Sequence, residues 1–345
     1  MPTDPRGAGV NLPSVVVLSP YHNRKDAVER TLTSLAAQKY ENARFIVWDD
    51  GSSDGTWEEL ERVAHSIGDP RLRVTRFEKN LGLTRGLNWA ISEFEGDYIA
   101  IWGSGDESHP DRIARQVQAL EIDKTRVLCA TASLSIDVVS GDTFVDESFS
   151  RHDIVLADIQ ETCPFTHGSV MYRQSALAAV GPYEEIFEWC ADWDIFFRLL
   201  KLGTGTYLPE PLYTRYARLD GASFNPKKSL SQIRHQALAK LLSNPGVDRD
   251  GIIEAVRING VKSVIEAHGI DITGPIYRRR IKLVLMGRRE QAHELSDLMA
   301  KDGLQSKMYF ALEFASKAAA RLPISSDRLI NSARSARAHI RLRKR

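Results

Sequence analysis

The chain has 345 residues, of which 43% are hydrophobic and 26% charged, and its net charge at pH 7 is +1. This length suits one large α/β domain with an additional region, and the composition is that of a globular protein. Because the positive and negative charges nearly cancel, composition gives no reason to expect nucleic acid as a partner. It leaves the oligomeric state open.

The cysteines Cys129, Cys163 and Cys190 are widely spaced and form no Cys-x-x-Cys pair. This pattern argues against a disulfide framework or a zinc site, and for a reducing compartment. Residues 1–12 are polar, lack the apolar core of a signal peptide, and are expected to form a flexible N-terminus. No apolar run approaches the roughly 18 residues that span a bilayer. We therefore expect a cytoplasmic protein, with peripheral attachment to the inner face of the membrane left open.

The first clear pattern along the chain is an apolar run at residues 14–19, typical of a strand buried on both faces of a parallel sheet. It ends in Pro20-Tyr21-His22-Asn23-Arg24, and a helix is expected from Asp26. A second strand at 45–48 runs directly into the segment 49–56, DDGSSDGT. Ligands of open α/β sheets bind outside such strand ends.

Within the segment 49–56, we interpret Asp49 and Asp50 as ligand-binding carboxylates at the end of a strand. Asp54 is interpreted as a turn residue that hydrogen-bonds its own backbone. Thr56 and Glu59 have the spacing of a capping box, which predicts a helix from Thr56.

The rest of the first two-thirds continues the alternation of strand and helix. Further strands are expected at 72–74, 98–102, 127–135, 168–172, near 207 and at 212–216, with an edge hairpin at 140–150. Helices are expected after 80–82, from 108–110, up to 180 and from Asp192 to 203. From residue 226 the pattern is helical throughout, with no strand signal.

This order predicts an α/β fold with a doubly wound mixed sheet, followed by an α-helical C-terminal region. We place the α/β domain at 13–225 and the helical extension, with a basic tail, at 226–345.

The motifs in this domain resemble those of family 2 glycosyltransferases, enzymes of the GT-A fold. The resemblance covers roughly residues 12–223 and leaves the last third unmatched. Any one of its motifs is weak, but their common order and spacing are specific. They are SPYHNR at 19–24, DDGSSDGT at 49–56, NLG at 80–82 with Asn88, Asp106 with PDR at 110–112, and ADWD at 191–194.

The resemblance implies an inverting transfer of sugar from a nucleotide diphosphate, with a UDP-sugar favoured, to a glycan or lipid-linked acceptor. Asp192 is then the catalytic base, or a helix N-cap, and the two roles are compatible. Pro20, Tyr21, Asp49 and Asp50 would line the nucleoside pocket. Arg24 and Arg85 are candidates for diphosphate contacts, although a solvated surface arginine is the commoner alternative. Weaker candidates for sugar or acceptor contacts are His167 and Trp189.

The sequence departs from the family at the metal site. Relatives carry Asp-x-Asp where this chain has Gly103-Ser104-Gly105 before Asp106. One interpretation is a rearranged Mn²⁺ or Mg²⁺ site that uses Asp106 and Asp220. The other is a metal-free enzyme in which Arg218, His167 or Lys227 balances the charge of the leaving group.

The same departure leaves open a catalytically silent relative that binds nucleotide or glycan as a partner subunit. A nucleotidyltransferase is disfavoured, because no Gly-rich loop with a lysine follows the first strand. The basic C-terminal tail could contact an anionic membrane, or be a solvated or packed helix end. Its cations are Arg321, Arg328, Arg334, Arg337, Arg341, Arg343, Lys344 and Arg345.

Overall fold

The computed structural model describes residues 12–146, 153–161, 165–217 and 225–304. The chain divides into two compact units, residues 1–217 and 218–345. Each unit is described by itself.

The first unit is built on one mixed sheet with the strand order β3-β2-β1-β4-β9-β6-β10-β5, with β7 paired to β6 and β8 to β10. Its strands are β1 (Val15–Tyr21), β2 (Ala43–Asp50), β3 (Leu72–Phe77), β4 (Tyr98–Ile101), β5 (Glu107–Ser108), β6 (Arg126–Asp137), β7 (Thr143–Asp146), β8 (Asp153–Ile154), β9 (Met171–Arg173) and β10 (Thr204–Ala217).

The strands β3, β2, β1 and β4 run parallel to one another, whereas β9 runs antiparallel to both β4 and β6. The start of β9 therefore lies at the same edge of the sheet as the carboxyl ends of β1, β2 and β4. This edge is where a ligand would bind in such a sheet.

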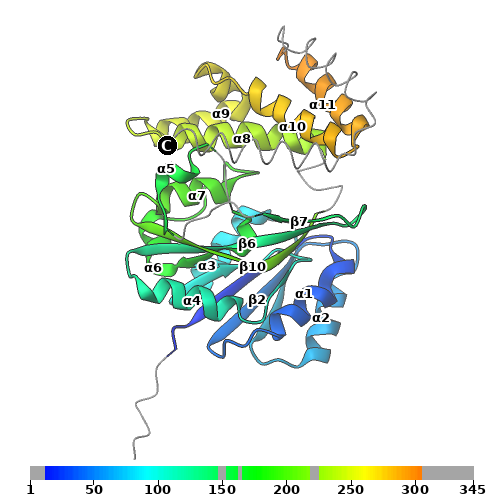
Figure 1. The fold of residues 1–345 in the computed structure, drawn as a ribbon, viewed down its shortest axis with the longest axis vertical. Coiled ribbons are helices and arrows are strands. Elements are labelled where there is room, and N and C mark those ends of the chain that lie inside the picture. Colours follow the sequence, from blue (N-terminus) through cyan, green and yellow to red (C-terminus); the bar gives the residue numbers. More distant parts are fainter. Residues whose placement is uncertain (1–11, 147–152, 162–164, 218–224, 305–345) are drawn as a thin grey trace, which may run out of the picture. The chain divides into compact units, whose positions relative to one another are not determined.

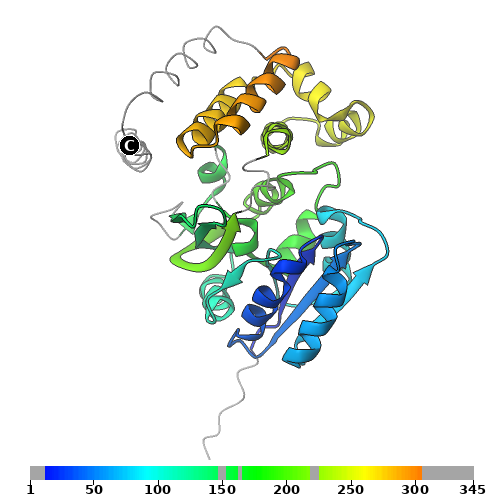
Figure 2. The ribbon, with the colours of Figure 1, turned by 90° about the vertical axis from the view of Figure 1, so that its right-hand side faces the viewer.

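Helices cover both faces of this sheet (Figure 1). Apolar residues of α1, α2 and α4 share one core with alternate residues of β1, β2 and β4. On the other face α3 packs so closely that a Cβ on Gly86 would lie 2.8 Å from Nε1 of Trp48. Figures 1 and 2 both show α1 and α2 side by side. The helices are α1 (Val28–Ala36), α2 (Thr56–Ile67), α3 (Leu83–Glu93), α4 (Arg112–Ile122), α5 (Leu156–Ile159), α6 (Gln174–Val180) and α7 (Ala191–Leu199), with short 3-10 turns η1 (Lys25–Ala27) and η2 (His167–Ser169).

The predicted α/β class and the mixed sheet are thus confirmed, but some local predictions were wrong. The helix expected from 108–110 begins at Arg112, because Glu107 and Ser108 pair with Thr214 and Tyr213 as strand β5. The strands expected near 207 and at 212–216 are one strand, β10, whose register against β6 shifts between Leu208 and Tyr213.

Arg112 links the end of β4 to α4 from a fully buried position. It donates to Gln116 Oε1 at 3.0 Å, to Ser108 Oγ at 3.1 Å and to the carbonyl of Ile101 at 3.0 Å. Burial lowers the pKa of Arg112 to about 10, so the side chain remains charged at neutral pH. Its hydrogen bonds therefore fix the end of β4 relative to α4.

All regular secondary structure described in the second unit is helical, as predicted. It comprises α8 (Pro226–Ser243), α9 (Arg249–Ala267), α10 (Thr273–Leu285) and α11 (Arg289–Lys301). Asn225 caps α8 by accepting from Lys228 N, and Asp248 caps α9 by accepting from Gly251 N. The predicted basic tail lies outside the described residues.

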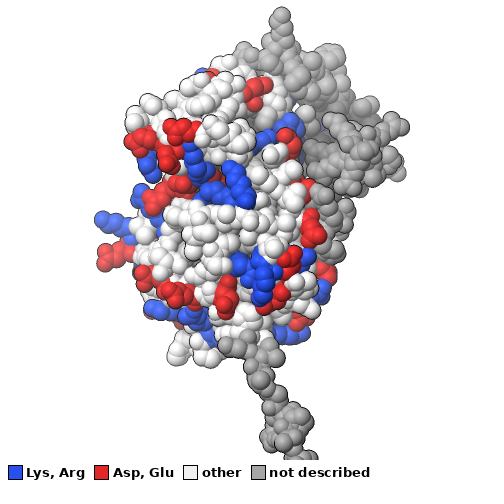
Figure 3. Space-filling view, turned by 90° about the vertical axis from the view of Figure 1, so that its left-hand side faces the viewer, with Lys and Arg blue, Asp and Glu red and all other residues white. Residues whose placement is uncertain are grey.

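Basic and acidic side chains both occur over the molecular face drawn in Figure 3, in small groups separated by uncharged surface. This agrees with the net charge of +1. Within the described ranges, no helix combines the length and the apolar character needed to cross a membrane.

We expect Arg112→Met to lower the free energy of unfolding by about 2–4 kcal/mol, because three buried acceptors lose a charged donor. The matched control is Arg115→Met on the same helix, which removes an exposed ion pair with Glu210 and is expected to cost less than about 1 kcal/mol. Urea denaturation of both variants measures the difference. Equal losses would contradict a specific role for Arg112.

Candidate active site

Asp50, the last residue of β2, ties this strand to the loop that begins α3. Its carboxylate accepts from Leu81 N at 2.7 Å and from Gly82 N at 2.9 Å. Asp49 is fully buried and lies 3.3 Å from Nε of Arg76. Asp49 and Asp50, the predicted nucleoside contacts, therefore both interact with groups of the protein itself. Their role toward a ligand stays a prediction.

The loops that follow β1 and β2 are bonded to each other at the same edge of the sheet. Asn23 N donates to Ser52 Oγ at 2.8 Å, and Ser53 N donates to Asn23 Oδ1 at 3.0 Å. Arg24 N donates to Thr56 Oγ1 at 2.8 Å. The motifs at 19–24 and 49–56 therefore form one structural element.

Asp54 has the turn role predicted for it, since it accepts from the backbone N of Thr56 at 3.0 Å and of Lys25 at 3.3 Å. The capping box predicted for Thr56 and Glu59 is wrong. The N-cap of α2 is Gly55, with φ +87°, and it has no side-chain cap. The Thr56 hydroxyl instead accepts from Arg24 N, while Glu59 pairs with Arg62 at 2.6 Å.

The structure places the residues at the end of β1 at different depths. Tyr21 is fully buried within the core cluster of the sheet. Its role in the nucleoside pocket stays a prediction. Pro20 and Arg24 are partly exposed and remain candidates.

Asp106 is fixed in the loop that follows β4. Its Oδ2 accepts from the Tyr213 hydroxyl at 2.6 Å and its Oδ1 accepts from Tyr216 N at 3.0 Å. Burial raises the pKa of Asp106 to about 6, although these hydrogen bonds and the positive charges of Arg215 and Arg24 act in the opposite direction. Asp106 is therefore a constrained carboxylate with cations close to it.

The Tyr213 hydroxyl fills the space beside two glycines. It accepts from Gly103 N at 2.9 Å. A Cβ on Gly168 would lie 2.0 Å from this hydroxyl, and a Cβ on Gly103 would lie 3.1 Å from it and 2.6 Å from Asp106 Oδ2. A side chain at 168 is therefore incompatible with the position of Tyr213, and one at 103 would collide with Asp106 and crowd Tyr213. The sequence pattern marked Tyr213 only as a strand residue.

His167 lies next to this cluster, at the turn that precedes β9. Its Nε2 is 3.0 Å from the Tyr183 hydroxyl, which in turn donates to Tyr172 at 3.2 Å. Burial lowers the pKa of His167, and the negative charge of Asp192 partly opposes this shift. His167, the predicted acceptor contact, is thus close enough to Asp192, the predicted base, for the charge of Asp192 to affect its pKa.

Asp192 is the second residue of α7, not its N-cap. The N-cap is Cys190, in the left-handed conformation with φ 62°. Asp192 is partly exposed, and its carboxylate accepts from Trp193 N at 2.9 Å. Asp194 is buried and pairs with Arg198 at 2.9 Å, which confirms its expected structural role. The alternative role of Asp192 as the cap is therefore wrong.

The remaining candidates are less engaged with this cluster. Arg85 is 61% exposed and pairs with Glu185 at 2.8 Å. Trp189 is half-buried, and its buried Nε1 has no hydrogen-bond partner within the described ranges. The predicted metal ligand Asp220 lies outside the described residues.

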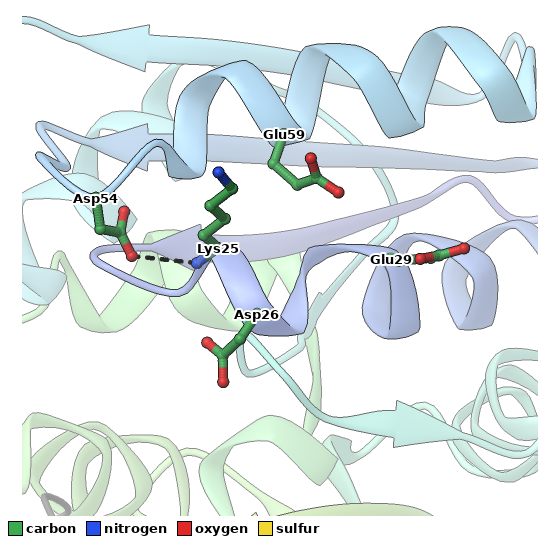
Figure 4. Close-up of a pocket in the computed structure, with 5 residues that line it drawn as sticks. All are labelled: Lys25, Asp26, Glu29, Asp54 and Glu59. Atoms are coloured by element: carbon green, nitrogen blue, oxygen red, sulfur yellow. Dashed lines mark hydrogen bonds between the residues drawn. The ribbon is translucent and has the colours of Figure 1, made fainter.

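A separate shallow pocket of about 450 Å³ lies beside the start of α1 and α2, lined by Lys25, Asp26, Glu29, Asp54 and Glu59 (Figure 4). Lys25 stands among its four carboxylates, and its backbone N bonds to Asp54. None of the predicted nucleotide-binding residues lines this pocket. The candidate site therefore stays at the edge of the sheet that carries Asp50, Asp106 and His167.

Comparison with known proteins identifies a family for part of the chain and the fold of its first unit. Residues 16–181 match Glycosyl transferase family 2. EpsE of Bacillus subtilis, which is named as a glycosyltransferase, is 29% identical over 210 residues, covering 58% of this chain and 72% of EpsE. The chondroitin synthase of Pasteurella multocida is 24% identical over 88% of this chain but only 31% of its own length.

Solved structures show the same fold. TarS 1–349 of S. aureus in complex with UDP has a TM-score of 0.54 at 17% identity, covering 85% of this chain and 93% of TarS 1–349. The mannosyltransferase PcManGT of Pyrobaculum calidifontis, in complex with GDP-Man and Mn²⁺, has a TM-score of 0.52 at 15% identity, covering 91% and 82% of the two chains. Residues 16–181 thus match glycosyl transferase family 2, and the first unit has the GT-A fold of the solved structures.

Because enzymes of this fold commonly use a divalent ion, we tested whether the residues after β4 fit one. Gly103 and Gly105 offer no side-chain ligand, and both oxygens of Asp106 already accept hydrogen bonds. Aspartate at 103 would clash with Asp106, while Gly105 has φ +91°, which strains any side chain. Within the described ranges, no group of three or more His, Cys, Asp and Glu residues could hold a metal. The described donor set does not fit a hard cation, which prefers several oxygen ligands.

We expect Gly168→Ala to lower the free energy of unfolding by about 1–3 kcal/mol, because its Cβ would overlap the Tyr213 hydroxyl. The effect should shrink to below about 1 kcal/mol in a Tyr213→Leu background, which removes the hydroxyl. A double-mutant cycle by urea denaturation measures this coupling. Additive losses would show that Tyr213 is not the residue displaced.

Proposed function

We propose that this enzyme transfers a sugar from a UDP-sugar to a glycan or lipid-linked acceptor, with inversion at the anomeric carbon and Asp192 as general base. One observation carries the proposal. The candidate donor residues Asp50 and Asp106 lie at the end of β2 and after β4, and His167, whose pKa is affected by the charge of Asp192, precedes β9 at the same edge. Donor and acceptor groups can thus meet at one place.

The chemistry of this transfer is a single displacement. The acceptor hydroxyl gives its proton to the Asp192 carboxylate while its oxygen forms a bond to the anomeric carbon. The bond from that carbon to the diphosphate breaks, and the nucleoside diphosphate leaves with the electron pair. Attack opposite the leaving group inverts the configuration.

Asp192 is suited to the role of base by its position. It is partly exposed at the start of α7, unlike Asp194, which is committed to Arg198. The segment before α7 is held to α3, because Asn88 donates to the carbonyl of Tyr183 at 2.9 Å and Thr84 donates to that of Phe187 at 3.1 Å. These bonds would keep the base in place beside the donor.

The choice of donor is supported by similarity of fold alone. TarS 1–349 has been solved in complex with UDP-GlcNAc as well as UDP, whereas PcManGT holds GDP-Man. A panel of UDP- and GDP-sugars, incubated with this chain and with candidate glycans, tests the proposal. Release of UDP that depends on the acceptor supports it. Binding of nucleotide without turnover would instead indicate a catalytically silent relative.

Membrane contact remains a prediction, because the basic tail that suggested it lies outside the described residues. The same holds for a location at the inner face of the membrane.

We expect Asp192→Asn to reduce the transfer rate by about two to four orders of magnitude, since a general base typically contributes that much. Affinity for the nucleotide should stay within about threefold, because the base acts on the acceptor. The contrasting variant Asp194→Asn should mainly reduce thermal stability, through loss of its buried pair with Arg198. Transfer assays, nucleotide titration and thermal unfolding distinguish the variants. Near-normal turnover in Asp192→Asn would rule out its role as base.

A further inference from the structure

Arg215 is a cation beside Asp106 that the sequence did not single out. It lies on β10 two residues after Tyr213, so both side chains point to the same face of the strand. Two nearby residues of β10 hold Asp106. Tyr213 donates to it from its hydroxyl at 2.6 Å, and Tyr216 donates from its backbone N at 3.0 Å. This arrangement places Arg215 at the edge of the sheet assigned to the donor.

Three other arginines near this edge already have partners. Arg112 is bound to three acceptors, Arg76 lies 3.3 Å from Asp49, and Arg30 donates to the carbonyl of Gly105 and stacks 3.8 Å from the ring centre of Tyr216. In contrast, Nε of Arg215 is buried and has no hydrogen-bond partner within the part of the chain that the structure describes. A buried donor of this kind is costly unless a ligand satisfies it.

Arg24 is the second cation near Asp106. It follows β1, is partly exposed, and its backbone is fixed by the hydrogen bond to Thr56. Electrostatic effects of both Arg24 and Arg215 reach Asp106. The charges of two guanidinium groups, from β10 and from the loop after β1, therefore act on one carboxylate at the edge where the described residues do not fit a metal.

We infer that Arg215 and Arg24 bind the diphosphate of the donor in place of a divalent ion. The inference rests on the proposed function, because it concerns the same donor site. Guanidinium groups bind phosphate oxygens through paired, charge-assisted hydrogen bonds. The same contacts would stabilise the negative charge that develops on the leaving diphosphate. In this arrangement the Tyr213 hydroxyl, and not an ion, fixes Asp106.

Calorimetric titration of the full chain with UDP, GDP and uridine, in excess EDTA and in Mn²⁺, tests the inference. We expect UDP to bind with the same affinity, within about threefold, in both conditions. Arg215→Gln should weaken UDP binding tenfold or more, about 1.4 kcal/mol, and leave uridine binding unchanged. Arg215→Lys should retain part of the affinity for UDP. The control is Arg115→Gln, an exposed arginine of α4 paired with Glu210, which should change neither.

The outcomes separate this inference from the proposed function. A gain of tenfold or more in UDP affinity with Mn²⁺, or loss of binding in EDTA, overturns the inference but leaves the transferase proposal standing. Equal weakening of UDP and uridine by Arg215→Gln, or no weakening of either, overturns the role of Arg215. Thermal unfolding of the variant verifies that it is folded. If no nucleotide binds in either condition, the proposed function and the inference both fail.

Discussion

The hydrogen bond from the Tyr213 hydroxyl to Asp106 is the contact on which the candidate site depends. The same hydroxyl accepts from Gly103 N; it leaves no room for a side chain at Gly168 and, together with the Asp106 carboxylate, crowds one at Gly103. One side chain of β10 thereby fixes the loop after β4 and the turn before β9. This steric constraint gives a physical reason for both glycines, including the one at the first Asp-x-Asp position.

The other half of the site depends on hydrogen bonds between loops that are distant in sequence. Asp50 holds the start of α3, and Asn23 and Arg24 are bonded to the segment after β2. Since these bonds satisfy backbone donors that would otherwise be exposed or unpaired, they order the loops before a ligand arrives. Such order lowers the entropic cost of binding.

Much of the architecture could be predicted from local pattern. Continuous apolar runs at β1 and β4, each followed by a helical pattern, are enough to predict parallel strands buried on both faces. The turn role of Asp54 and the structural role of Asp194 also followed from residue type and neighbours. Predictions of helix ends fared worse: Thr56 had the right spacing for a cap, but its hydroxyl is used by Arg24, from another loop.

The sequence by itself thus determined the α/β class, the helical second region and which strand ends carry carboxylates, because these depend on periodicity and short-range chemistry. Only the tertiary structure decided that Tyr21 is buried, that Tyr213 occupies the space beside the glycines, and that Arg215 stands near Asp106. Residues 103, 168 and 213 lie far apart along the chain, and β10 reads as an ordinary strand. Their proximity follows from the order of strands in the sheet, which no local pattern encodes.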